Sequence, residues 1–403
     1  MSGGTGAHIA MFGIPAHGHV NPGLAVIREL VDRGHRVTYS INEKFAPQVE
    51  AAGATPVLYD STLPPDDEPG AWPADGVQAV FGILREAMAV LPQMEAAYEH
   101  DRPDLFLYDL GGYTARILAT RWDRPIIQLS PAAVPWKGYE EDMAPVVEAM
   151  QRNPRYREYE AAFTAWLREN GVDMHHYEFW GRPERCIALI PRSLQPNDKE
   201  VPDNYTFVGP CLGDRTYQGT WRPPETQRPV LYISLGSAYN YQPEFYRTCM
   251  AAFGGLEWHA VMQIGRFVDP AELGPIPANF EVHPFVPQLS VLRRADAFIT
   301  HAGMASTLEA LYHGVPMVAV PQLADQFGNA KRLADLGVGR FLPTEDVAAE
   351  TLRAAVLDLA GDHEITARLG ALREEMRLAG GARAAADIIE ARLGEARLGE
   401  GIR

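Results

Sequence analysis

Two histidines separated by one glycine, His17 and His19, follow a short apolar stretch near the start of the chain. An imidazole can remove a proton from a hydroxyl when a carboxylate on its other ring nitrogen fixes its tautomer. Asp109 ends a second apolar stretch, DLFLYD, and can supply that carboxylate to His19 if both stretches are parallel strands. The pair therefore indicates general-base chemistry. The alternatives are a helix-capping histidine with a turn-forming aspartate, and a metal site for which no third ligand is evident.

A second group of residues has the chemistry of an anion site. His301 ends the apolar stretch ADAFIT, small residues follow, and a helix is expected to open near Ser306. Backbone N–H groups and the helix dipole favour a phosphate at a helix start. Glu309 lies one turn further along the same face, where it can accept hydrogen bonds from vicinal hydroxyls such as those of ribose. We interpret this group as a site for a phosphorylated sugar.

Further polar and aromatic residues also follow predicted strands. Phe285 can stack on a base, and Asp325 and Gln326 can bind sugar hydroxyls. Taken singly, a glutamate on a helix is usually solvated and a phenylalanine usually belongs to the core. Because all these residues fall at strand ends or at one helix start, together they indicate a nucleotide-sugar site.

Alternating strands and helices must position both groups. The unit of strand HIAMFGI (8–14), helix and strand RVTYSI (36–41) implies parallel pairing with a right-handed crossover. Asn21 is expected to cap that helix, with Pro22 at its first helical position. The same alternation resumes at VLYISLGS (230–237). The pattern predicts an α/β protein of two Rossmann-like, doubly wound domains that face a cleft.

The domain boundaries follow from composition. We expect an N-terminal acceptor-binding domain over 1–212, a Gly- and Pro-rich linker over 213–229, a C-terminal donor-binding domain over 230–380 and a helix over 381–403 that packs back on the N-terminal domain. Two segments interrupt the first domain. Residues 61–75 are Pro-rich and acidic and should form a long mobile loop, whereas residues 135–182 are helical and rich in aromatics. Both are candidate walls for an apolar acceptor.

The composition limits the partners. The 403 residues carry a formal net charge of −16, which argues against nucleic acid. Three cysteines without a zinc or redox spacing are expected to be reduced thiols. The start of the chain lacks the pattern of a signal peptide, and no apolar run is long enough to span a membrane. A cytoplasmic protein is expected, and its oligomeric state is left open.

Several segments together resemble a known family. FVPQ, THAGMASTLEALYHGVPMVAVPQLADQFGNA and GHVNPGLAV are similar to signatures of the UDP-dependent glycosyltransferases with the GT-B fold. WKGYEE, YTFVGPCLGDR and QIGR extend the likeness to the actinomycete macrolide glycosyltransferases over nearly the whole chain. Unlike the plant members, this chain has Phe285 in place of a tryptophan and Met304-Ala305 in place of Trp-Asn, so the sugar is not fixed by the resemblance.

The resemblance implies a role for individual residues. His19 would be the catalytic base and Asp109 would orient it, while no metal would be required. The donor UDP-sugar, with UDP-glucose as the expected co-substrate, would be held by Ser237, Phe285, Val286, Gln288, His301, Gly303, Ser306, Glu309, Asp325 and Gln326. For the small-molecule acceptor, the candidates are Trp136, Phe81 and Met143. No covalently bound cofactor is expected.

The expected reaction is an inverting transfer of a hexose to a hydroxyl of a macrolide or similar hydrophobic natural product, serving antibiotic inactivation. A glycosyltransferase of natural-product biosynthesis would have the same residues. A UDP-sugar epimerase on the same fold would need no acceptor pocket. A non-catalytic helper that binds the sugar nucleotide would not need to keep both His19 and Asp109.

Overall fold

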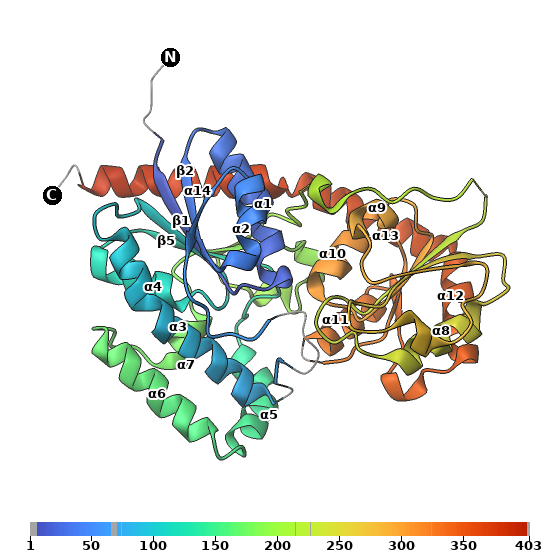
Figure 1. Ribbon diagram of the computed structural model, residues 1–403. Coiled ribbons are helices and arrows are strands. Elements are labelled where there is room, and N and C mark those ends of the chain that lie inside the picture. Colours follow the sequence, from blue (N-terminus) through green and yellow to red (C-terminus); the bar gives the residue numbers. More distant parts are fainter. Residues whose placement is uncertain are drawn as a thin grey trace. The chain divides into compact units, whose positions relative to one another are not determined.

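The computed structural model describes residues 6–65, 71–73, 75–213, 215–225, 227–323 and 325–400. The chain forms two compact units. The first comprises Met1–Pro64, Pro73–Leu212 and Ala379–Arg403, and the second comprises Pro65–Trp72 and Gly213–Leu378. Figure 1 shows the strands and helices of each unit. None of the described helices combines the length and apolar character that crossing a membrane requires.

The first unit is built on a parallel sheet in the order β3-β2-β1-β4-β5-β6-β7. Its strands are β1 (His8–Phe12), β2 (Arg36–Ile41), β3 (Thr55–Leu58), β4 (Leu105–Tyr108), β5 (Ile126–Ser130), β6 (Cys186–Ala188) and β7 (Tyr205–Phe207). Its helices are α1 (His17–Asp32), α2 (Ala46–Ala51), α3 (Gly76–Tyr98), α4 (Tyr113–Trp122), α5 (Tyr139–Gln151), α6 (Tyr156–Glu169), α7 (His176–Gly181) and α14 (Gly381–Glu400). The strand order reverses between β1 and β4, which pair in register from Ile9 with Leu105.

The second unit repeats this plan with the order β10-β9-β8-β11-β12-β13, again all parallel. Its strands are β8 (Val230–Ser234), β9 (His259–Gln263), β10 (Phe280–His283), β11 (Ala297–Thr300), β12 (Met317–Ala319) and β13 (Gly339–Phe341). Its helices are α8 (Pro243–Phe253), α9 (Gln288–Leu292), α10 (Met304–His313), α11 (Gln326–Asp335), α12 (Ala349–Ala360) and α13 (His363–Leu378). The order reverses between β8 and β11. Two doubly wound α/β units confirm the predicted fold class.

The start of α1 differs from the sequence-based prediction. The helix begins at His17 with Ala16 as its N-cap, so Asn21 and Pro22 lie inside it instead of opening it. The carbonyl of Ala16 accepts hydrogen bonds from the N–H groups of His19 (3.0 Å) and Val20 (2.9 Å), which closes the first turn without a side-chain cap. Because of this earlier start, His19 belongs to the first turn of a helix and not to a loop.

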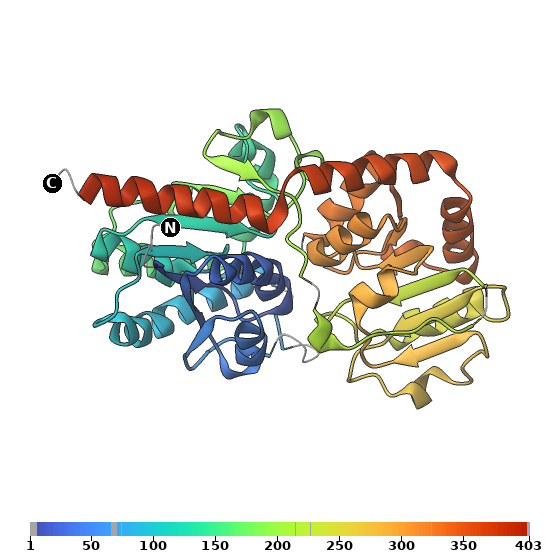
Figure 2. The same ribbon diagram turned by 90° about the horizontal axis from the view of Figure 1, so that it is seen from above.

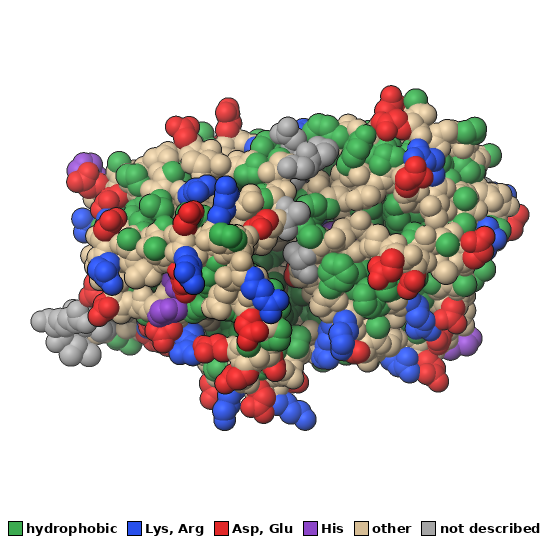
Figure 3. Space-filling view, turned by 90° about the horizontal axis from the view of Figure 1, so that it is seen from below, with side chains coloured by type: hydrophobic (Ala, Val, Ile, Leu, Met, Phe, Trp, Pro, Cys, Tyr) green, Lys and Arg blue, Asp and Glu red, His purple; other side chains and the backbone are tan. Residues whose placement is uncertain are grey.

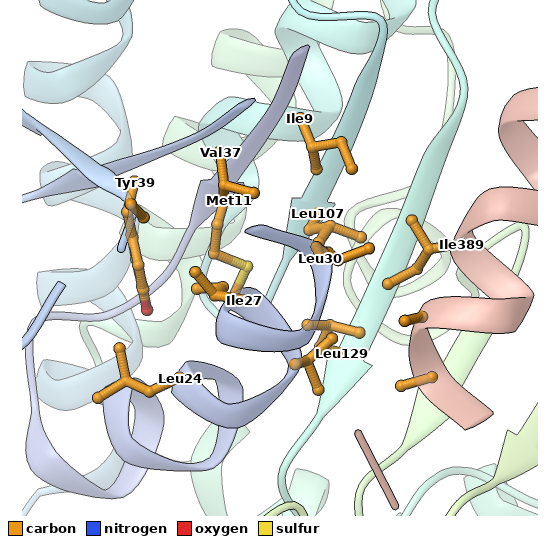
Figure 4. Packing of buried hydrophobic residues seen from close by; sticks show 14 of the residues in the cluster. Ile9, Met11, Leu24, Ile27, Leu30, Val37, Tyr39, Leu107, Leu129 and Ile389 are labelled. Carbon is orange, nitrogen blue, oxygen red and sulfur yellow. The ribbon is translucent and has the colours of Figure 1, made fainter. Parts of the chain in front are cut away.

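The last helix completes the core of the first unit. Figure 2 shows α14 running along that unit, and Figure 4 shows Ile389 pointing into the cluster that contains Leu30 and Leu129. Ile389 is fully buried, and full burial of such a side chain contributes about 1.5–3 kcal/mol. Arg33 of α1 also binds Asp387 (2.6 Å) and Glu390 (2.7 Å) of α14. The predicted return of the C-terminal helix is confirmed.

The segment 213–229, expected to be a linker, packs on the second unit where it is described. Trp221 is 9% exposed, and its indole N–H donates to Glu281 (3.0 Å). Its backbone N–H donates to the hydroxyl of Ser290 (3.0 Å), which in turn donates to the Trp221 carbonyl (3.1 Å). An aromatic side chain and three hydrogen bonds hold the segment to the sheet unit. The segment is therefore part of the domain that it leads into.

Three other expectations concern loops, thiols and surface charge. Residues 66–70 and 74 of the loop 61–75 lie outside the described residues, whereas Ser61 and Thr62 are bound by the carboxylate of Glu86. All three cysteines are buried and not in disulfides. Figure 3 shows acidic and basic side chains interspersed over the face in view, rather than the basic surface that nucleic acid requires.

Candidate active site

His19 and Asp109 meet at the point where the strand order of the first sheet reverses. His19 lies in the first turn of α1, which follows β1, and Asp109 directly follows β4. The Nδ1 atom of His19 lies 2.8 Å from Oδ2 of Asp109. The crevice at such a reversal is where open α/β sheets hold their ligands. The contact expected from the sequence is therefore present.

The environment of Asp109 assigns the tautomer of His19. The carboxylate is 1% exposed and accepts hydrogen bonds from the backbone N–H groups of Ile14 (3.0 Å) and Gly111 (2.8 Å). The carboxylate is already the acceptor in these two bonds, and it accepts from His19 as well. His19 must then donate from Nδ1, which places its lone pair on Nε2. A side chain that is 28% exposed and has this tautomer can act as a base.

His17 has a different environment. Its ring packs edge-on against Phe45, with the ring centroids 5.0 Å apart. His19, in contrast, makes the contact with Asp109 that tunes an imidazole as a base.

His301 occupies the corresponding reversal in the second unit. It follows β11, and Ala302 after it adopts a left-handed φ of 60°. The ring lies in a space left by two glycines, because a Cβ would be 2.6 Å from the ring at Gly236 and 2.4 Å from it at Gly303. Gly303 is also the N-cap of α10. Gly303 thus leaves room for the ring of His301, and any side chain at this position would displace the ring.

Burial makes His301 a neutral group. It lowers the pKa of the imidazole to about 4. The Nδ1 atom is buried and has no hydrogen-bond partner among the described residues. A buried polar atom without a partner is costly, and a bound anion can satisfy it when that nitrogen carries the proton. The geometry suits a neutral donor to a phosphate oxygen at the start of α10.

A hydrogen-bonded network lies on the adjacent face of α10. Glu309 is 1% exposed, and its Oε1 atom lies 2.7 Å from Nη1 of Arg215. The amide of Gln288 donates to Oε2 of Glu309 (2.6 Å) and to the hydroxyl of Ser306 (3.2 Å). Tyr232 donates its hydroxyl proton to the side-chain amide oxygen Oε1 of Gln288 (3.1 Å). The structure brings Gln288, Ser306 and Glu309 together and adds Arg215 and Tyr232, which sequence reasoning missed.

The neighbouring candidates differ in exposure. Phe285 is 58% exposed, so its ring is available for stacking. Val286 is 2% exposed, and its N–H donates to the amide oxygen of Gln263 (3.1 Å). The side chain of Val286 belongs to the core, which leaves its backbone for any contact with a ligand. Ser237 is exposed on the loop after β8.

Asp325 and Gln326 lie at the start of α11, and residue 324 before them is outside the described residues. Asp325 is exposed and accepts a hydrogen bond from the amide of Asn329 (2.9 Å). Gln326 is buried, and its amide oxygen accepts from the N–H groups of Gln322 (2.8 Å) and Leu323 (3.1 Å). Gln326 thus holds the loop after β12 in place, while Asp325 presents a carboxylate to the surface.

The aromatic segment 135–182 is mostly core. Its buried aromatics are Tyr156, Tyr159, Phe163, Trp166 and Phe179. In contrast, α5 contains no buried residue. Partly exposed Met143 lies on this helix, and Trp136 precedes it, donating its indole N–H to Asp142 (2.8 Å). Phe81 of α3 packs edge-on against Tyr159 of α6.

The three acceptor candidates therefore come from α3, from α5 and from the loop before α5. They are partly exposed, as residues that contact an apolar ligand must be before it binds. The aromatics of α6 stabilise the helices behind them.

Three side chains of α6 and α7 could approach a metal ion. They are Glu160, His175 and His176, whose ligand atoms lie within 4.8 Å of one another. Ligand bonds of about 2.0–2.2 Å allow at most ~4.4 Å between two atoms on one ion. The Nε2 atom of His176 lies 4.0 Å from Oε1 of Glu160, and neither residue is part of the two groups described above. These three residues are therefore not evidence for a metal ion bound at His19.

The structural comparison defines a class of proteins. A solved structure described as the glycosyltransferase of kitacinnamycin matches with a TM-score of 0.89 and 46% identity, covering 96% of this chain and 99% of that chain. Residues 247–389 match the family model described as "Erythromycin biosynthesis protein CIII-like, C-terminal domain". Both matches, with two Rossmann-like units, define a glycosyltransferase of the GT-B fold.

The sequence relatives agree. Oleandomycin glycosyltransferase of Streptomyces antibioticus is 53% identical over 396 residues, 96% of this chain and 91% of the relative. NDP-glycosyltransferase YjiC of Bacillus subtilis (strain 168) is 38% identical, over 95% of this chain and 97% of the relative. The chain belongs to this glycosyltransferase family and is an enzyme that transfers a sugar.

Proposed function

We propose that this enzyme transfers a hexose, with glucose expected, from a UDP-sugar to a hydroxyl of a macrolide or a similar hydrophobic natural product, with inversion at the anomeric carbon. The observation that carries the proposal is the 2.8 Å contact between His19 and Asp109 at the strand reversal of the first sheet. Similarity to oleandomycin glycosyltransferase supports the acceptor class.

In the proposed reaction, Nε2 of His19 takes the proton of the acceptor hydroxyl. The oxygen attacks the anomeric carbon of the donor from the face opposite the diphosphate. As the new C–O bond forms, the bond to the diphosphate oxygen breaks and its electron pair leaves with UDP. Asp109 stabilises the imidazolium that forms and holds the ring in place. In-line attack inverts the configuration.

The second unit would supply the leaving-group chemistry. We assign the diphosphate to His301, Ser306, Ser237 and the N–H groups at the start of α10. Two observations support this assignment: His301 is a neutral hydrogen-bond donor, and the dipole of α10 favours an anion at its start. The ribose is assigned to Glu309 with Gln288, and the base to Phe285 and the backbone of Val286. Asp325 and Gln326 would bind the sugar. These donors stabilise negative charge as it develops, so the proposal requires no metal.

We further propose that Trp136, Phe81 and Met143 contact the acceptor, and that the enzyme inactivates antibiotics in the cytoplasm. Reduced, buried thiols support a reducing compartment. The intact pair of His19 and Asp109 supports catalysis over a helper role that only binds the sugar nucleotide.

The deciding experiment incubates the enzyme with UDP-glucose and a panel of macrolides and flavonoids, and follows the products by mass spectrometry. A macrolide product that is heavier by one hexose is expected, and a β-linkage from the α-linked donor would establish inversion by NMR. If UDP-glucose is consumed equally with and without acceptor and no conjugate forms, the proposed transfer is wrong.

A further inference from the structure

Arg215 makes a buried ion pair with a carboxylate that the proposed function assigns to the donor. Its side chain is 9% exposed, that of Glu309 is 1% exposed, and the two atoms lie 2.7 Å apart. A charge removed from water is costly unless it is paired and hydrogen-bonded. Arg215 provides this opposite charge to Glu309. It also has a left-handed φ of 45°, which a residue with a side chain rarely adopts.

The two partners described for Glu309 do not use all of its hydrogen-bond acceptor sites. A carboxylate offers about four lone-pair sites, two on each oxygen. Arg215 occupies a site on Oε1, and the amide of Gln288 occupies a site on Oε2. Counting the contacts between described residues, one site therefore remains on each oxygen. Two acceptor sites, one on each of two neighbouring oxygens, match the two hydroxyls of a vicinal diol.

The charge of Arg215 maintains this pattern. Without the guanidinium, the buried carboxylate would lose its opposite charge and the contact that holds Oε1. A carboxylate that can turn would no longer present one acceptor site on each oxygen to a diol.

We propose that Arg215 is the positioning residue that holds the carboxylate of Glu309 in place, and that it thereby gives the enzyme its preference for ribonucleotide over 2′-deoxyribonucleotide donors. This inference rests on the proposed assignment of Glu309 to the ribose. It concerns the ion pair of Arg215 and Glu309, and not the residues assigned to the base, the phosphates or the acceptor.

The test measures the dissociation constants of UDP and 2′-deoxy-UDP by calorimetry for the wild-type enzyme and for Arg215→Met and Arg215→Lys. The wild type is expected to bind UDP at least ~10-fold more tightly than the deoxy compound, because one lost hydrogen bond to a charged group has about this effect. In Arg215→Met, UDP affinity should fall by roughly 10-fold or more and the ratio should approach ~1. Arg215→Lys, which keeps the charge, should restore part of the preference.

The matched control is Arg222→Met, which removes an exposed arginine from the same segment and should leave the ratio unchanged. Thermal unfolding of each variant tests folding, since a purely structural loss would weaken both nucleotides equally and leave the ratio intact. An unchanged ratio in Arg215→Met contradicts the inference. Tighter binding of both nucleotides would also overturn it, by showing that Arg215 blocks the ribose.

The outcomes also separate this inference from the proposed function. If the wild type fails to bind UDP, the donor assignment itself is wrong. If UDP binds and transfer occurs while the ratio ignores Arg215, only the positioning role is wrong.

Discussion

Each unit places a histidine at the reversal of its strand order, but the two histidines follow different central strands and have different surroundings. In the first unit, His19 follows the first central strand and bonds to the buried carboxylate of Asp109 after the neighbouring strand. In the second unit, His301 follows that neighbouring strand instead, and the loop after the first central strand offers Gly236 and no carboxylate. The first environment makes a base. The second makes a neutral donor with its pKa lowered to about 4.

The comparison teaches that the scaffold brings an imidazole to the strand reversal, and that the residues on the adjacent strand end decide what the imidazole does. A carboxylate stabilises the imidazolium that proton removal creates. A pair of glycines brings backbone close to the ring and excludes water, so the charged form is penalised. The following predictions test whether His19 acts as a base and His301 as a neutral donor.

The largest effect is expected for His19→Ala. Loss of a general base costs about 10²–10⁴-fold in kcat, while the affinity for UDP should stay within about twofold because the base does not touch the donor. Steady-state kinetics and calorimetry give the two numbers. His17→Ala, which removes the ring that packs on Phe45, is the control and should retain most of the transfer activity. Full activity of the His19 variant would remove it from the mechanism.

Asp109→Asn is the next test, because it keeps the shape of the side chain and removes its charge. The amide no longer stabilises the imidazolium, and its NH₂ group can turn toward Nδ1 and shift the ring proton to Nε2. We expect a loss of roughly 10²-fold in kcat. A variant as active as the wild type would show that the contact only supports the fold.

A pH experiment tests His176, a buried histidine to which, unlike His301, no ligand is assigned. Burial lowers the pKa of His176 in the first unit to about 4, below the ordinary value of 6.5. The neutral form is therefore favoured by folding, so this contribution to stability is complete above pH 6.5 and is lost as the pH falls toward 4. At pH 5 the loss amounts to about 2 kcal/mol. Urea unfolding at pH 7.5 and pH 5 should show a smaller difference for His176→Phe than for the wild type, with UDP affinity unaffected.

The smallest effect is expected for Gly303→Ala. The added Cβ would lie 2.4 Å from the ring of His301, although the backbone φ of −60° accepts alanine without strain. Displacement of the ring should weaken UDP binding by roughly 10-fold, the effect of one misplaced hydrogen bond. Gly328→Ala, where a Cβ meets nothing within 4 Å, serves as the control. Equal affinities in both variants would mean that His301 does not bind the diphosphate.

The sequence predicted the parts of this arrangement that depend on strand order. Buried apolar stretches ending in His, Asp or Gly identify parallel strands, and their common edge predicted the contact of His19 with Asp109. The helix start at His17 was missed because Asn21-Pro22 forms a better local cap than Ala16. Asn21-Pro22 correctly indicated a helix, but the helix begins earlier because the chain turns into it soon after β1.

Arg215 could not be predicted in the same way. It lies in a Gly- and Pro-rich stretch, and its partner Glu309 is far along the chain on a helix whose burial the sequence pattern does not reveal. Nothing local pairs a loop arginine with a distant carboxylate. The glycines beside His301, in contrast, had a signal: small residues follow the histidine in HAG, and LGS follows the neighbouring strand.

The return of α14 to the first unit has a consequence for how the protein is made. Because Ile389 and its neighbours fill the core beneath α1, the ribosome must complete the entire second unit before the first can close its core. The first unit therefore remains unfinished during synthesis, with the apolar surface of α1 uncovered. Chaperone contact at that stage, and loss of yield on truncation before residue 381, are the expected costs of this chain order.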